Sequence, residues 1–214
     1  MTEDPPRRSP LYPVSLDVRG RPCLVVGGGR VAARKARGLL EAGASVTVVA
    51  PSLHADMEAL APLLHAVERR AYRRGDASGF RLVLTATGDP GVDGVVHEDA
   101  ERAGLWVNAA DDRAHSSFIL PAVHRDGAVT VAVSTGGLSP ALASWVRDRI
   151  AAGEGDGLGA LAQLLSEARE RLRAEGVRPE AVDWAALLDG PLPGLVRSVD
   201  ADNARAIVDA ATGR

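Results

Sequence analysis

Short apolar runs alternate with amphipathic stretches along the first half of the chain. Runs rich in β-branched residues, typical of strands, occupy residues 23–26, 45–50, 81–87 and 105–108. Helical spacing of the apolar positions between them predicts helices over residues 30–42, 55–67 and 90–103. Strands that alternate with helices form a parallel sheet with right-handed crossovers. The pattern therefore predicts an α/β fold, a Rossmann-type domain with a parallel sheet.

The rhythm of the sequence changes after about residue 112. Two further strands are expected in residues 116–127 and 128–135, joined by a turn at Asp126 and Gly127. A helix should follow, because Ser139 can cap it and Pro140 suits its first position. The remaining sequence carries almost only helical signals. Three regions result, an α/β domain, a small mixed segment and a helical C-terminal region: residues 1–112, 113–152 and 153–214.

The stretch GGGRVA at residues 27–32 lies directly between a predicted strand and a predicted helix. It fits the pattern G-x-G-x-x-A of dinucleotide-binding turns, in which Gly27 makes the tight turn, Gly29 lets a pyrophosphate approach and Ala32 lets helix and sheet pack closely. The helix N-terminus supplies amide donors to the phosphates. We therefore expect an NAD cofactor, held by nine residues: Gly27, Gly28, Gly29, Arg30, Val31, Pro51, Ser52, Thr87 and Asn108.

One part of the dinucleotide pattern is missing. The second strand of such sites usually ends in an Asp or Glu that binds the ribose hydroxyls, but here it runs into Ala50, Pro51 and Ser52. Ser52 offers a weaker ribose contact, and no arginine stands in that place to favour a 2′-phosphate. NAD is the preferred cofactor, and NADP stays an open alternative. Arg30, at the positive end of its helix, is mildly unfavourable there unless it faces an anion.

Composition and charge exclude several classes of protein. The chain has 214 residues, 46% of them hydrophobic, which is typical of a globular protein. Its formal net charge of −3 argues against general binding of nucleic acids. No apolar run reaches the roughly 20 residues that span a bilayer, and the polar start of the chain does not resemble a secretory signal. We expect a cytoplasmic protein without nucleic-acid or membrane partners, in which Cys23 is a small buried side chain.

Four blocks of the sequence resemble the precorrin-2 dehydrogenases, the family of the dehydrogenase and ferrochelatase part of siroheme synthase. The blocks are residues 13–51, NAADD at 108–112, SSFILPA at 116–122 and VAVSTGGLSPALA at 131–143. The resemblance implies NAD-dependent oxidation of precorrin-2 to sirohydrochlorin, followed in some members by insertion of Fe²⁺ to give siroheme. It also implies a homodimer built through residues 113–152, which makes that region a dimerisation and substrate segment.

The same resemblance assigns roles to individual residues. The acidic active-site position of the family falls on Asp111, whose carboxylate is suited to accept the proton lost during oxidation. The second glycine turn, at residues 134–137, would shape the pocket for the carboxylates of the tetrapyrrole; an ordinary capped turn without ligand is the alternative. Thr135 stands where some relatives have serine. The expected substrate contacts are Ser134, Thr135, Gly136, Gly137, Arg113 and Arg125.

His115 lies four residues after Asp111, so a helical turn would bring the two side chains together as ligands for a passing Fe²⁺. An exposed loop histidine is the simpler interpretation. No further ligands are spaced around the pair as a metal site requires, so no resident metal is predicted.

Two other functions compete with the dehydrogenase. A non-catalytic NAD-sensing module would need a DNA-binding or partner-linked element, and none is visible. An unrelated dehydrogenase of small hydroxy acids would need a catalytic Lys or His after the Rossmann unit. The only lysine, Lys35, precedes that position, and the histidines have no persuasive setting.

Overall fold

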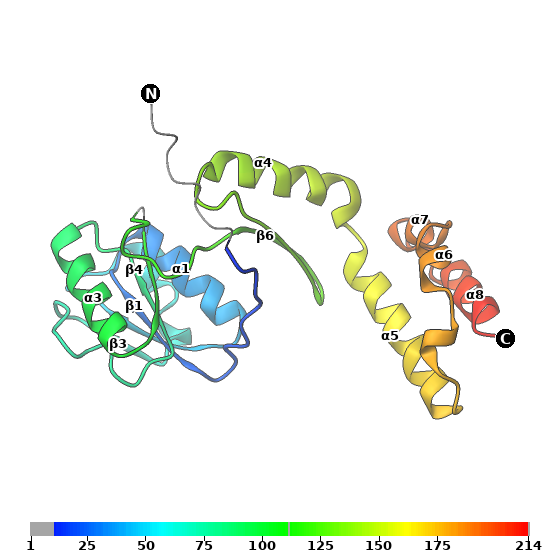
Figure 1. The fold of residues 1–214 in the computed structure, drawn as a ribbon, viewed down its shortest axis with the longest axis horizontal. Coiled ribbons are helices and arrows are strands. Elements are labelled where there is room, and N and C mark those ends of the chain that lie inside the picture. Colours follow the sequence, from blue (N-terminus) through cyan, green and yellow to red (C-terminus); the bar gives the residue numbers. More distant parts are fainter. Residues whose placement is uncertain (1–10, 111, 214) are drawn as a thin grey trace, which may run out of the picture. The chain divides into compact units, whose positions relative to one another are not determined.

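The computed structural model describes residues 11–110 and 112–213. Its contacts divide the chain into two compact units, residues 1–120 and 121–214, which are described separately (Figure 1). The sequence predicted three regions, whereas the contacts distinguish two units, so the division into three stays a prediction.

The first unit is a five-stranded parallel sheet in the order β3-β2-β1-β4-β5. Its strands are β1 (Pro22–Val26), β2 (Ser45–Val49), β3 (Ala66–Glu68), β4 (Leu82–Thr85) and β5 (Trp106–Ala109). Its α-helices are α1 (Arg30–Glu41), α2 (Ala55–Glu58) and α3 (Pro90–Arg102). The Rossmann-type α/β fold expected from the sequence is confirmed.

The two faces of this sheet carry separate cores, because alternate strand residues point to opposite sides. One core joins β1 and β2 to α1 through Val25, Val46, Val48, Ala32, Ala36 and Leu39. The other joins β1 and β4 to α3 through Leu24, Val26, Val83, Val96 and Ala100. Helices α1 and α3 therefore cover opposite faces (Figure 1).

The helix predicted over residues 55–67 is wrong beyond Glu58. Helix α2 ends there, a 3-10 turn follows at Ala61–Leu63, and β3 begins at residue 66. Pro62 has no amide hydrogen and its ring crowds the preceding turn, so an α-helix does not continue through it. The amide of His65 donates instead to Val46 O, at 2.8 Å, where the pairing with β2 begins.

The second unit starts with an antiparallel hairpin, β6 (Ala122–Asp126) and β7 (Val129–Val133). The expected turn is present, with Gly127 at φ +53°. Helix α4 (Pro140–Ile150) packs on the hairpin, and Ser139 caps it as expected, its Oγ accepting from the amide of Leu142 at 3.2 Å.

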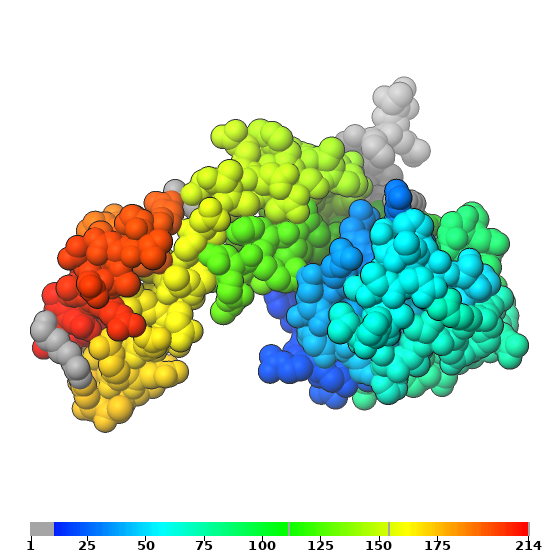
Figure 2. Space-filling model, turned by 180° about the vertical axis from the view of Figure 1, so that it is seen from behind, coloured from blue at the N-terminus to red at the C-terminus, as the bar shows by residue number. Residues whose placement is uncertain are grey.

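The C-terminal region is helical, as predicted. A π-helical turn, Ala151–Gly155, leads into α5 (Leu158–Ala174), a 3-10 turn at Pro179–Ala181, α6 (Trp184–Leu188), α7 (Leu192–Arg197) and α8 (Ala201–Ala211). These helices share one core of Leu161, Ala168, Leu192, Ala204 and Val208. Figure 2 shows them, coloured yellow to red, packed against one another.

The thiol of Cys23 should report on the opening of the sheet. Its side chain is fully buried in β1, and burial raises its pKa to about 11. The unfolded thiol ionises near pH ~8.5, so the free energy of unfolding should fall as the pH rises from there toward 11. At pH 8 we expect an aromatic disulfide reagent to label the native chain only slowly and the urea-unfolded chain at once. Immediate labelling of the native chain would contradict the central position of β1.

Candidate functional site

The sheet has a topological switch point between β1 and β4. The chain passes from β1 outward to β2 and β3, then returns to the other side of β1 to form β4 and β5. In open parallel sheets the ligand crevice lies at the carboxyl ends of the strands beside such a point. The segment that leaves β1 there is the glycine turn at residues 27–29.

The first two glycines of the turn are packed tightly against neighbouring backbone. Gly27 has φ +122°, and a Cβ on it would lie 2.4 Å from Ala86 O, beyond the end of β4. A Cβ on Gly28 would lie 1.9 Å from Ser52 O, beyond the end of β2. The carbonyl of Gly28 also accepts from the amide of His54 at 2.8 Å. The turn is therefore fixed against both neighbouring loops.

Gly29 differs from them because it faces open space. A Cβ built on it meets no atom within 4 Å, and its φ of −78° is ordinary for any residue. It precedes α1, whose first turn contains no acidic residue. Ala32 in that turn is fully buried against the sheet, as the dinucleotide pattern requires. Open space beside Gly29, at the N-terminus of a twelve-residue helix, suits a pyrophosphate.

Four other expected cofactor residues border this turn. Arg30 and Val31 begin α1 and are exposed, and Pro51 and Ser52 are exposed just after β2. The structure thus brings both segments to the carboxyl edge of the sheet. Their contacts with a cofactor stay a prediction.

Thr87, two residues after β4, is already engaged within the protein. Its hydroxyl lies 2.8 Å from Oδ1 of Asp93 and 3.0 Å from the amide of Asp89 that caps α3. The buried carboxylate of Asp93 also accepts a short hydrogen bond from Thr85. Thr87 therefore orders the start of α3, and its expected contact with a cofactor stays a prediction.

Lys35 is the buried cation beside the site that sequence reasoning missed. Its side chain is only 9% exposed and passes from α1 to the carboxyl ends of β4 and β5. The ammonium donates to Asn108 Oδ1 at 2.7 Å, Thr85 O at 3.1 Å and Asn108 O at 3.3 Å. Asn108, expected to bind the cofactor, donates in turn from Nδ2 to Phe118 O at 2.9 Å. Lys35 thus fixes the strand ends that surround the site.

The sequence did contain a signal for this position. Ala32, Lys35, Ala36 and Leu39 follow helical spacing, so the lysine lies on the buried stripe of α1. A cation on an apolar stripe that faces a parallel sheet must find acceptors, and backbone carbonyls at strand ends are the nearest ones.

Replacing Lys35 by methionine should lower the free energy of unfolding by about 2–3 kcal/mol, because buried Asn108 Oδ1 loses a charge-assisted hydrogen bond. Urea titration would measure the change. Arg34→Met is the matched control, since Arg34 is exposed on the same helix, and it should change stability by less than about 0.5 kcal/mol. Equal stability of the Lys35 variant and the wild type would mean that the hydrogen bonds only offset the cost of burying the ammonium.

Asp111, the expected catalytic residue, lies outside the described residues. Its neighbour Asp112 is held in place: Oδ1 accepts from the amides of Ala114 at 3.0 Å and His115 at 3.2 Å, and Oδ2 contacts His115 Nδ1 at 2.5 Å. The hydrogen bond from His115 is the main reason why the pKa of Asp112 is below its usual value. The His115 ring also packs edge-on against His97 of α3, with centroids 5.0 Å apart.

Residues 116 and 117, expected to begin a long strand, run beside β5 instead. The hydroxyl of Ser117 accepts from the amide of Val107 at 2.8 Å, and that of Ser116 accepts from the amide of Ala109 at 2.9 Å. The predicted strand over residues 116–127 is confirmed only in β6, which starts at Ala122. The serine hydroxyls serve as partners for the open edge of the sheet, which would otherwise expose unpaired amides.

The second glycine turn lies in the second unit. Gly136 and Gly137 have φ of +64° and +83°. The Thr135 hydroxyl lies 3.0 Å from Ser139 N and 3.1 Å from Ser139 O, and the Ser134 hydroxyl accepts from Gly136 N at 3.2 Å. Both hydroxyls therefore hold the turn, and their expected contacts with a substrate stay a prediction.

The two expected substrate arginines belong to different units. Arg113 is half-buried in the loop after β5, and Arg125 is exposed on β6. Their contacts with a substrate stay a prediction.

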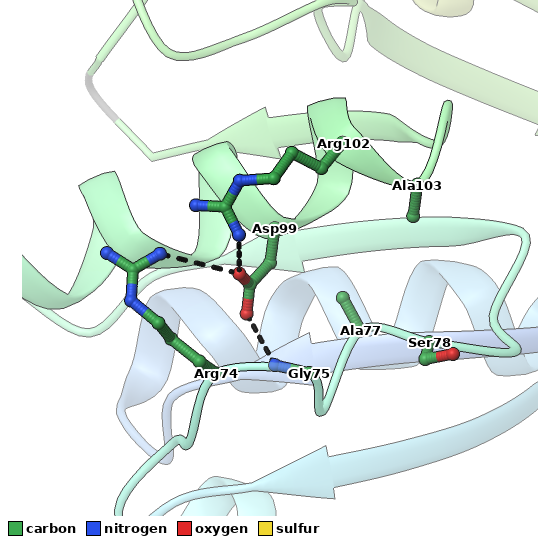
Figure 3. Close-up of a pocket in the computed structure, with 7 residues that line it drawn as sticks. All are labelled: Arg74, Gly75, Ala77, Ser78, Asp99, Arg102 and Ala103. Carbon is green, nitrogen blue, oxygen red and sulfur yellow. Dashed lines mark hydrogen bonds and ion pairs between the residues drawn. The ribbon is translucent and has the colours of Figure 1, made fainter.

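The first unit has a depression at its surface, formed by residues 74–78 and 99–103 (Figure 3). It is lined by Arg74, Gly75, Ala77, Ser78, Asp99, Arg102 and Ala103. These residues lead into β4 and β5, so the depression lies at the amino ends of the strands. That edge is opposite the one where Rossmann folds bind ligands.

The carboxylate of this depression, Asp99, lies close to both of its arginines. Burial of Asp99 opposes its ionisation, but hydrogen bonds from the amide of Gly75 and the hydroxyl of Tyr72 keep its pKa below the usual value. Arg102 and Arg74 lie 2.9 and 3.6 Å from its Oδ1. The group stabilises the contact between α3 and the loop before β4.

Within residues 11–110 and 112–213, no group of three or more His, Cys, Asp or Glu side chains is arranged to hold a metal ion. No helix in the same part of the chain is long and apolar enough to cross a bilayer.

Two family profiles match the chain in consecutive segments. Residues 14–122 match the profile described as "Putative NAD(P)-binding", and residues 126–152 match "Sirohaem biosynthesis protein central". The first covers the sheet with its glycine turn, and the second covers the hairpin from the end of β6 and helix α4.

Individual proteins agree with these profiles. A siroheme synthase of Methylococcus capsulatus is 41% identical over 203 residues, 93% of this chain and 43% of the relative. One of Chromobacterium violaceum is 40% identical, over 92% of this chain and 42% of the relative. The chain thus spans less than half the length of these relatives.

A solved structure extends the similarity to the whole fold. The structure titled "SirC, precorrin-2 dehydrogenase" superposes with a TM-score of 0.71 at 26% identity, covering 94% of this chain and all of that one. The chain therefore belongs to the siroheme-synthase family of NAD(P)-binding proteins, the family of the precorrin-2 dehydrogenases.

Proposed function

We propose that the chain oxidises precorrin-2 to sirohydrochlorin with NAD⁺, a step of siroheme synthesis. The observation that carries the proposal is the glycine turn at the switch point of the sheet, in a chain of this family. The macrocycle loses a hydride and a proton, and NAD⁺ supplies the hydride acceptor. We also propose a cytoplasmic location, where soluble NAD⁺ is at hand.

The residues around the turn would bind and orient the dinucleotide. Amides at the start of α1, beside Gly29, would donate to the pyrophosphate, and Ser52 is within the loop that would face the adenosine ribose in this fold. Asn108 lies at the end of β5, where Lys35 and the carbonyl of Phe118 fix both ends of its amide. A fixed amide at this edge can hold a ligand without first losing conformational freedom.

Asp111 is proposed to accept the proton. A positioned carboxylate is suited to this role, and the residues on either side of Asp111 support it. The amide of Ala110 donates to Thr85 O at 2.9 Å, and Asp112 forms a β-bridge with Ala109. Both contacts tie the flanking backbone to the carboxyl ends of β4 and β5, where the cofactor is expected.

The tetrapyrrole carries acetate and propionate groups, so its site needs cations and amide donors. In the second glycine turn Gly136 and Gly137 have positive φ, and their backbone amides would serve as donors. Arg113 and Arg125 would supply guanidinium groups, which pair well with carboxylates. Insertion of Fe²⁺ is proposed as a further step of the same site, in which Asp111 would accept the pyrrole protons. Iron is then a substrate of the reaction.

A homodimer is proposed through β6, β7 and α4. A two-stranded hairpin is marginally stable alone, and among the described residues of these three elements only Ala143 is buried. Large apolar side chains lie open on α4, with Leu142 50% and Trp145 57% exposed. These elements therefore lack a core of their own. A second copy of the chain, with the same open face, can supply it.

The test is anaerobic incubation of the purified chain with enzymatically prepared precorrin-2. With NAD⁺, NADH and the spectrum of sirohydrochlorin should appear together, and neither should appear without NAD⁺. Fe²⁺ added afterwards should enter the macrocycle faster than in a control without protein. Light scattering on the same sample should give the mass of two chains. If NAD⁺ binds and precorrin-2 stays unchanged, the dehydrogenase is excluded and an NAD-sensing module is favoured.

A further inference from the structure

The loop after β2 lacks the group by which Rossmann sites usually reject a 2′-phosphate. A carboxylate in this place binds the ribose hydroxyls of NAD and repels the extra phosphate of NADP. Here β2 ends at Val49 and is followed by Ala50, Pro51 and Ser52. The loop that faces the adenosine ribose is therefore open to a phosphate on grounds of charge.

A cation reaches this loop from the other side of the site. Arg30 begins α1 beside the glycine turn, and its Nε lies 3.2 Å from His54 Nε2. His54 is fixed because its amide donates to Gly28 O at 2.8 Å. The sequence has no arginine at the end of β2 that could bind a 2′-phosphate. Arg30 reaches the loop after β2 from α1 instead.

The hydrogen bonds around His54 cannot all be satisfied at once. Its Nδ1 lies 3.1 Å from the amide of Asp56, and its Nε2 faces the Nε–H of Arg30. A neutral imidazole has one acceptor nitrogen and a protonated one has none, so at least one of these two donors lacks an acceptor in the ring. When Nδ1 accepts, Nε2–H and Arg30 Nε–H face each other across 3.2 Å. An anionic oxygen beside the pair would accept from both once the two side chains separate.

We propose that Arg30 and His54 form a subsite for a 2′-phosphate, so that the chain binds NADP⁺ as well as NAD⁺. The inference rests on the cofactor site of the proposed function. The competing anion is Asp56, whose Oδ2 is 3.8 Å from Arg30 Nε. Both side chains are well exposed, 77% and 52%, so their attraction is screened and weak. A phosphate offers Arg30 a bidentate contact that is stronger.

The test uses fragments of the two cofactors that differ only in the 2′-phosphate. Calorimetric titration of the purified chain with 5′-AMP and with 2′,5′-ADP separates this contact from the rest of the site. We expect 2′,5′-ADP to bind at least as tightly as 5′-AMP. Arg30→Ser should lower the ratio of the 2′,5′-ADP affinity to the 5′-AMP affinity by tenfold or more, the size expected for one charge-assisted contact. NADPH and NADH fluorescence should show the same difference.

Arg34→Ser is the matched control, because Arg34 is exposed one turn further along α1 and its removal changes the net charge equally. It should leave both fragments unaffected, and thermal unfolding should confirm that both variants are folded. Binding of 5′-AMP without 2′,5′-ADP, or equal losses in the two variants, would overturn the subsite and leave the proposed function standing. If NAD⁺ itself did not bind, the proposed function and the subsite would fail together.

Discussion

Replacing Gly28 by alanine is expected to unfold the protein or to destabilise it by about 4 kcal/mol or more, a loss reserved for severe backbone or core disruption. The new Cβ would stand 1.9 Å from Ser52 O, which is backbone and has no side-chain freedom to give way. The turn and the loop after β2 would have to separate, breaking the hydrogen bond from His54 to Gly28. Urea titration followed by circular dichroism would measure the loss.

Gly29→Ala provides the comparison one residue away. Its Cβ meets nothing within 4 Å, so stability should stay within about 0.5 kcal/mol of the wild type. Affinity for NAD⁺ should nevertheless fall by about tenfold or more, because the methyl group would occupy the open space beside the turn that a pyrophosphate needs. Calorimetry would measure this affinity. Unchanged binding in Gly29→Ala would mean that the phosphates do not approach this turn.

Asp111→Asn should lower kcat for precorrin-2 oxidation by about a hundredfold or more, the range for loss of a general base, without changing the affinity for NAD⁺. The amide keeps the size of the side chain and cannot accept the proton. Formation of NADH with saturating precorrin-2 would measure kcat.

The control for this variant is Asp112→Asn. An amide oxygen at position 112 can still accept from the amides of Ala114 and His115, so we expect activity within about threefold of the wild type. The opposite result, an active Asp111 variant and an inactive Asp112 variant, would assign the base to the pair of Asp112 and His115.

The sequence predicted the strands that are buried on both faces and the edge strand β5, and it missed β3 at the other edge. Each of β1, β2 and β4 carries a run of buried apolar residues, which stands out in any hydrophobic pattern. β3 has three residues, two half-buried and one exposed. Its sequence, Ala66 to Glu68, continues the apolar spacing of α2, so the pattern predicted a helix there. Only Pro62 marked the break.

The candidate site was predictable where it depends on local backbone. The glycine turn needs small residues at fixed spacing between a strand and a helix, and the sequence displays them. The contacts of Lys35 with Thr85 and Asn108 join residues 50 and 73 positions apart, and no local pattern records such a pairing. The cation that Arg30 brings to the loop after β2 was missed for the same reason.

The burial of Lys35 also limits which covalent modifications the folded chain can carry. It is the only lysine in the sequence, and the other cationic side chains are guanidinium or imidazole groups, which do not react as amines do. A folded copy therefore presents no lysine side chain to acetylation, to ubiquitin-like conjugation or to amine-directed labels. Any such mark on residue 35 would record that the α/β unit had opened.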